Sequence, residues 1–180
     1  LAGDGLLTHA FYIASCAKVN DTIKVNCIKT LAEMAGVNGM VLGQCLDTEE
    51  NEETTWESLQ KIHKYKTGCL LAAPLMMGAY CAKQPEEIVQ KWKNIGIMMG
   101  LAFQIQDDIL DVTGDQKELG KSIGKDALEG KATYVSMNGL ETAAEKVREL
   151  TGHALSAMDG LSEENEFLKN LVEHLMTRTK

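Results

Sequence analysis

Apolar residues recur at intervals of three and four along most of the chain, which is the spacing of one face of a helix. Residues that cap or start helices divide this pattern: Asp21 and Thr22 before one stripe, Thr54 or Thr55 before another, and Pro85 before a third. Helices are predicted over residues 6–17, 21–35, 56–82, 85–112, 139–161 and 163–179, with a further glycine-interrupted helix that reaches Asp47. Pro74 is expected to kink the helix over 56–82. The pattern predicts an all-α fold in which residues 1–180 form a single domain.

The composition and charge of the chain exclude several fold classes and binding partners. Of 180 residues, 44 % are apolar, only 5 % are aromatic and two are proline, which favours helices over a β-sandwich. The net charge of −8, with no long basic run, makes nucleic acid and anionic membrane surfaces poor partners. The sequence contains no stretch of eighteen apolar residues, which is about the length needed to span a bilayer. The five cysteines show no metal-binding spacing, so we expect buried free thiols in the reducing cytoplasm.

Residues 96–115 form a helix with an unusual polar stripe. At 100° per residue, its polar side chains fall within an arc of about 100° and the rest of the surface is mostly apolar. The stripe consists of Gln104, Asp107, Asp108 and Asp111. Carboxylates this close repel one another, and a hard divalent cation such as Mg²⁺ would offset the repulsion. The alternative, a solvated acidic face near a helix end, fits the apolar flanks poorly.

A second helix carries a cation among apolar positions. Lys66 occupies a stripe position where an aliphatic residue belongs, so its ammonium needs an anion such as phosphate. We expect Lys66 to be unpaired within the protein and to face the same cavity as Asp107. The alternative for Lys66 is snorkelling to the surface. Lys121 and Lys131 lie next to glycines, as an anion-binding loop requires.

These segments resemble the motifs of one enzyme family. Residues 103–111, Phe-Gln-Ile-Gln-Asp-Asp-Ile-Leu-Asp, resemble the second aspartate-rich motif of the trans-isoprenyl (polyprenyl) diphosphate synthases of the bacterial farnesyl/geranylgeranyl type. Four other segments resemble further elements of the same family, in the same order along the chain: residues 1–4, Gly43-Gln44 with Asp47, residues 63–68, and residues 120–126. The resemblance implies an isoprenoid-synthase-type helical bundle around a central cavity.

The resemblance also implies residue roles. Asp107 would ligate Mg²⁺ directly, while Asp108 and Asp111 would support the water shell of the metal. Lys66, Lys121 and Lys131 would contact an allylic diphosphate, and Thr67 and Gln104 would lie near the carbocation and the departing diphosphate. The activity implied is condensation of an allylic diphosphate with isopentenyl diphosphate, in a homodimer, with Lys66, Thr67, Gln104 and Asp107 as the catalytic residues.

One part of the family pattern is absent from these residues. The first aspartate-rich motif, the paired arginines and the isopentenyl diphosphate pocket lie upstream of residues 1–4 in the family. We therefore expect this chain to be the C-terminal portion of a synthase, with the N-terminal helices missing and the fragment alone inactive. Two other interpretations are a class I terpene cyclase and a non-catalytic regulatory subunit of a prenyl diphosphate synthase. The all-aspartate motif disfavours the first, and the retained carboxylate repulsion disfavours the second.

Overall fold

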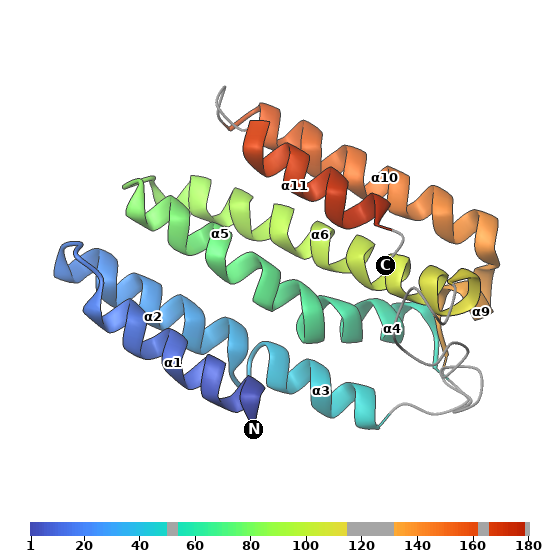
Figure 1. The fold of residues 1–180 in the computed structure, drawn as a ribbon, viewed down its shortest axis with the longest axis horizontal. Coiled ribbons are helices and arrows are strands. Elements are labelled where there is room, and N and C mark those ends of the chain that lie inside the picture. The colour runs from blue at the N-terminus through green and yellow to red at the C-terminus, as the bar shows by residue number, and fades with distance from the viewer. Residues whose placement is uncertain (50–53, 115–131, 162–165, 179–180) are drawn as a thin grey trace.

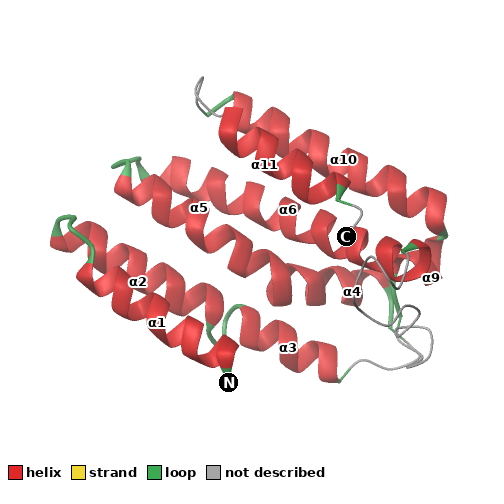
Figure 2. Cartoon of the chain, in the orientation of Figure 1, coloured by secondary structure: helices red, strands yellow, loops and turns green. Residues whose placement is uncertain are grey.

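A computed structural model describes residues 1–49, 54–114, 132–161 and 166–178, which form helices and no strands (Figure 2). The prediction of an all-α fold is confirmed for these residues. In chain order the elements are α1 (Ala2–Cys16), α2 (Asp21–Ala35), α3 (Met40–Thr48), α4 (Trp56–His63), the π-helical turn η1 (Lys64–Gly68), α5 (Cys69–Cys81), α6 (Glu86–Thr113), α9 (Tyr134–Asn138), α10 (Leu140–Asp159) and α11 (Glu166–Thr177).

Side-chain caps fix where several helices begin. Thr55 accepts a hydrogen bond from the backbone N–H of Ser58 at 3.3 Å, as the sequence predicts. Pro85, predicted to be the first residue of the next helix, lies one position earlier, at the cap of α6. At α2 the prediction was wrong by one residue, because Asn20 is the cap and accepts from the N–H of Ile23 at 2.8 Å. The short helix α9 was not predicted. It begins at a capping box in which Thr133 and Ser136 bond to each other's backbone N–H groups.

The long helix α6 lies at the centre of the arrangement. It contacts α5 along one side and α10 along the other, while α2 packs against the outer side of α5 (Figure 1). The helix α11 lies beside α10, and α1 packs on α2 (Figure 1). As its apolar circumference predicts, α6 is surrounded by other helices along most of its length.

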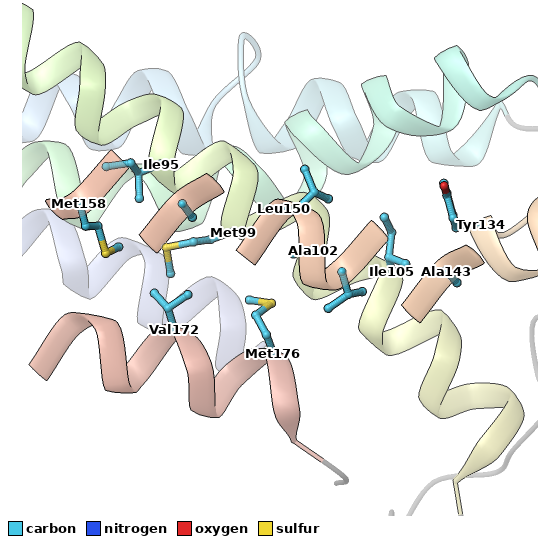
Figure 3. Close-up of a cluster of buried hydrophobic side chains, with 12 residues drawn as sticks. Ile95, Met99, Ala102, Ile105, Tyr134, Ala143, Leu150, Met158, Val172 and Met176 are labelled. Carbon is cyan, nitrogen blue, oxygen red and sulfur yellow. The ribbon is translucent and has the colours of Figure 1, made fainter. Parts of the chain in front are cut away.

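The larger core cluster joins α6 to the C-terminal helices. Ile95, Met99, Ala102 and Ile105 of α6 pack against side chains of α9, α10 and α11 (Figure 3). Their partners are Tyr134, Ala143, Val147, Leu150, Ala154, Met158, Val172 and Met176. Because all twelve are less than 9 % exposed, this cluster holds α6, and with it the aspartate stripe, in a fixed position.

The stretch 56–82 holds an irregularity that was not predicted, and the prediction about the cysteines needs correction. The irregularity is the π-helical turn at Lys64–Gly68. Pro74 lies within the α-helix α5, and the kink expected there stays a prediction. Leu59, Ile62, Cys69, Ala73 and Met76 are buried, as predicted. Cys27 and Cys69 are buried free thiols, but Cys16, Cys45 and Cys81 are exposed because they lie on outward faces or at helix ends.

Candidate active site

Lys66 is held by an acidic partner on a neighbouring helix. Its Nζ donates to Oδ2 of Asp47, near the end of α3, at 2.5 Å. The side chain of Asp47 is only 11 % exposed and that of Lys66 is 32 % exposed. The prediction of an unpaired ammonium is therefore wrong: the wider π turn directs Lys66 towards α3 and away from the aliphatic core. The pair also rules out snorkelling into solvent as the fate of this side chain.

Two glycines allow the backbones around the π turn to approach closely. A methyl group at Gly43 of α3 would lie 2.6 Å from the carbonyl carbon of Tyr65, and one at Gly100 of α6 would lie 2.7 Å from the backbone nitrogen of Gly68. Contacts this short are not found for real Cβ atoms. The π turn is thus wedged between α3 and α6, and only glycine fits at both contact points.

This packing brings Thr67 to the stripe on α6. The hydroxyl of Thr67 donates to Oε1 of Gln104 at 3.2 Å. Beside this bond lies a small cavity of about 40 Å³. Its lining residues are Asp47, Leu59, His63, Lys66, Gln104, Asp108, Ala132 and Thr133. Lys66 and Gln104 therefore share a cavity with one aspartate of the stripe, as expected, but that aspartate is Asp108 and not Asp107.

Asp108 is the most buried carboxylate of the stripe, with 4 % of its surface exposed. Its Oδ2 accepts a hydrogen bond from the backbone N–H of Tyr134, the first residue of α9, at 3.0 Å. The ring of Tyr134 in turn contacts the ring of Trp56 edge-on, with centroids 4.4 Å apart. Asp108 thus joins α6 to α9 and, through Tyr134, to α4.

Asp107 points to a different neighbour. Its Oδ1 accepts a hydrogen bond from the guanidinium of Arg178, which follows α11. The same guanidinium lies over the ring of Phe103, with its carbon 3.7 Å from the ring centroid. Since neighbouring residues on a helix are rotated by about 100°, Asp107 and Asp108 serve different contacts.

The remaining predicted site residues are Asp111, Lys121 and Lys131. Asp111 is half-buried, one turn beyond Asp107 on the same side of α6. Lys121 and Lys131 lie outside the described residues. Among the residues that the structure does describe, no three His, Cys, Asp or Glu side chains converge as a ready metal site. The donor set nevertheless suits a hard cation, because Asp107 and Asp111 offer carboxylate oxygens. A positively charged group, the guanidinium of Arg178, already lies against Asp107.

Sequence reasoning missed two residues of this site. Asp47 belongs to a recognised motif element, but nothing in its spacing identifies Lys66 as its partner, because the two residues lie on separate helices. Arg178 belongs to the helix predicted over 163–179, whereas α11 ends at Thr177, and nothing in the sequence identifies the partner of Arg178. Its partner can be identified only when the packing of α11 on α10 and α6 is known.

Over the described ranges, none of the helices combines the length and the apolar character needed to cross a membrane.

Comparisons with known proteins agree with the motif assignment. Residues 1–174 match the family model described as polyprenyl synthetase. Over its whole length, the chain is 37 % identical to the farnesyl diphosphate synthase of Micrococcus luteus and 38 % identical to that of Escherichia coli, covering 62 % and 63 % of those proteins. A crystal structure of a geranyltransferase from Helicobacter pylori, complexed with magnesium and isoprenyl diphosphate, matches 97 % of this chain with a TM-score of 0.82 and 36 % identity. That match covers 57 % of the Helicobacter pylori chain. The chain therefore spans about 60 % of the length of its relatives, and it belongs to the polyprenyl synthetase family.

Proposed function

We propose that the protein containing this chain is a prenyltransferase of isoprenoid biosynthesis. It would condense an allylic diphosphate with isopentenyl diphosphate: diphosphate leaves the allylic carbon, the isopentenyl double bond attacks that carbon, and a proton is lost. The observation that carries the proposal is the meeting of Lys66, Thr67 and Gln104 beside the aspartate stripe of α6. The relatives named farnesyl diphosphate synthase support it across the whole chain.

The side chains of the π turn suit binding of the leaving diphosphate. Lys66 would supply positive charge to the diphosphate oxygens, and Asp47 keeps its ammonium oriented towards the cavity until an anion binds. Thr67 and Gln104 hold each other in place, so their dipoles are fixed before charge develops on the reacting carbon. On the resemblance, Lys121 and Lys131 would also contact the allylic diphosphate.

Mg²⁺ is the metal that we propose for the stripe, with Asp107 as direct ligand and Asp108 and Asp111 supporting its water shell. When bound, Mg²⁺ would neutralise charge on the leaving diphosphate. The carboxylate chemistry of the three residues fits this ion. Asp108 is anchored to the backbone N–H of Tyr134 through Oδ2, so it would also hold α9 against the site.

This chain would carry one half of the active site, within the C-terminal part of a polyprenyl synthase domain over residues 1–180. The second aspartate-rich motif is present, and a diphosphate held between metal ions needs carboxylates on two sides. We therefore expect the 180 residues alone to show no steady turnover.

A homodimer is proposed through α1 and α2. The helix α1 packs on α2, and its outer face exposes large apolar side chains. Leu6 is 72 % exposed, Ile13 is 56 % exposed, and Val25 of α2 is 61 % exposed. Apolar side chains gathered on one face indicate a protein–protein contact, and a second copy would cover it.

The test is replacement of the proposed metal ligand in the full-length protein. Asp107→Ala should lower turnover by about three orders of magnitude or more because the proposed metal ligand is lost. The fold should stay intact, since the lost pair with Arg178 is part-exposed and the repulsion between Asp107 and Asp111 is relieved. Asp159→Ala is the matched control, since Asp159 forms a comparable ion pair with Lys169 on the surface. Pyrophosphate release and circular dichroism are measured for both variants. Near-normal turnover of Asp107→Ala in magnesium buffer would overturn the assignment.

A further inference from the structure

Arg178 makes three separate contacts with one turn of α6. Its guanidinium donates to Asp107 and lies over the ring of Phe103, and its backbone carbonyl accepts from Nε2 of Gln106 at 3.2 Å. The side chain of Arg178 is 19 % exposed and that of Asp107 is 38 % exposed. Arg178 is therefore bound against the aspartate stripe.

The contact leaves one polar group of the arginine unsatisfied. Nε of Arg178 is buried and has no hydrogen-bond partner within the described part of the chain. A buried N–H without an acceptor lowers the net gain from the contact. The arginine is thus held at Asp107 mainly by charge and by the aromatic ring, and a stronger cation could displace it.

We propose that Arg178 is a placeholder cation for the metal, so that Arg178 and a divalent ion compete for Asp107. The inference rests on the proposed function, in which Asp107 ligates Mg²⁺. With no metal bound, the guanidinium would neutralise Asp107 and relieve its repulsion with Asp111. Metal binding would break the ion pair and free Arg178, which could then pair with an anion such as diphosphate.

Competition for one carboxylate has a measurable consequence. If metal must displace Arg178, the observed association constant for the metal equals that of the open site multiplied by the fraction of protein in which the ion pair is broken. Removing the arginine should then tighten metal binding. By thermodynamic reciprocity, bound metal should weaken the pair between Arg178 and Asp107 by the same factor.

The first experiment uses Mn²⁺ alone as the probe and the full-length protein, at constant ionic strength. Free Mn²⁺ is counted by electron paramagnetic resonance, and the sites lost in Asp107→Asn define the binding that depends on Asp107. We expect Arg178→Gln to bind Mn²⁺ about tenfold more tightly at those sites, given the strength of a part-buried ion pair with an aromatic contact. The control is Lys169→Gln, which removes one positive charge and one surface ion pair from α11 and should change nothing.

A second measurement needs no variant at position 178. Trypsin must take the Arg178 side chain into its own pocket, so cleavage after Arg178 reports how often the contact with Asp107 is open. We expect Mn²⁺ to speed this cleavage about fivefold in the wild-type protein, as followed by intact mass. In Asp107→Asn, cleavage should be fast with or without metal.

The outcomes separate this proposal from the proposed function. If no Mn²⁺ binding depends on Asp107, the metal assignment fails. If binding depends on Asp107 but Arg178→Gln matches the wild type, or if Mn²⁺ leaves the cleavage rate unchanged, the metal assignment stands and the placeholder role is wrong.

Discussion

The close approach of α6 to the π turn predicts a large effect from one added methyl group at Gly100. In Gly100→Ala, the new Cβ would lie 2.7 Å from the backbone nitrogen of Gly68 and 3.2 Å from the carbonyl carbon of Thr67. Non-bonded heavy atoms prefer separations of about 3.5–4.0 Å. The two elements must therefore move apart by about 1 Å, and both atoms belong to backbone, which cannot rotate away.

This movement acts on stability and on the site together. Overpacking of this kind costs about 1–3 kcal/mol, while the gain in helix propensity from glycine to alanine offsets up to about 1 kcal/mol. The hydrogen bond from Thr67 to Gln104 is already 3.2 Å long, so a shift of about 1 Å breaks it and removes a further ~1 kcal/mol. We expect a net loss of about 1–3 kcal/mol in the free energy of unfolding.

Urea unfolding and steady-state turnover of the full-length protein measure the two effects. Gly152→Ala on α10 is the matched control, since a methyl group there meets nothing within 4 Å. That control should be neutral or up to about 1 kcal/mol more stable. Should Gly100→Ala prove as stable and as active as Gly152→Ala, the idea that glycine at this position sets the distance between α6 and the π turn is refuted.

Three further predictions concern charge, pH and assembly. Lys66→Met should destabilise the protein by about 1–3 kcal/mol in urea unfolding, because the largely buried Asp47 loses the cation paired with it. Adding Asp47→Leu should restore most of the stability but not the affinity for diphosphate. A Lys66→Met variant as stable as the wild type would contradict this reasoning. Burial, with a smaller contribution from Cys81, raises the pKa of the Cys27 thiol to about 11. The folded state then holds this proton more tightly than the unfolded chain, so stability should fall as pH rises from about 9 to 11, and Cys27→Ala should flatten that slope in melting experiments; an unchanged slope would contradict the assignment. Leu6→Lys should shift sedimentation of the full-length protein from dimer towards monomer, and an unchanged mass would place the interface elsewhere.

Local features of the chain could be predicted from sequence because they depend on neighbours in the chain. The helical stretches, the cap at Thr55 and the acidic stripe of α6 follow from periodicity and propensity. The buried residues of the stretch 56–82 also follow, since the apolar stripe faces the core wherever the helix packs.

Contacts between distant segments could not be predicted in the same way. The pairs Lys66–Asp47 and Asp107–Arg178 join residues on separate elements, and many acids and bases on the chain offer the same charges. The π turn was missed because it differs from an α-helix in hydrogen-bond register, which side-chain periodicity over five residues does not reveal.

The π turn at Lys64–Gly68 also bears on which sequence changes the chain could accept during evolution. A π turn is an α-helix with one residue inserted, so deleting a single residue there would restore regular helix geometry locally. The turn takes up the extra residue, because a helix with i→i+5 hydrogen bonds winds less per residue than an α-helix. The same deletion would therefore leave α4 and α5 in nearly their present relative orientation, with Leu59 and Ile62 still buried. It would change the directions of the side chains of the turn, however, and take Lys66 away from Asp47. A length change of one residue, harmless to the packing of α4, would here remove the charge pair of the cavity, so the insertion should persist wherever Lys66 is used.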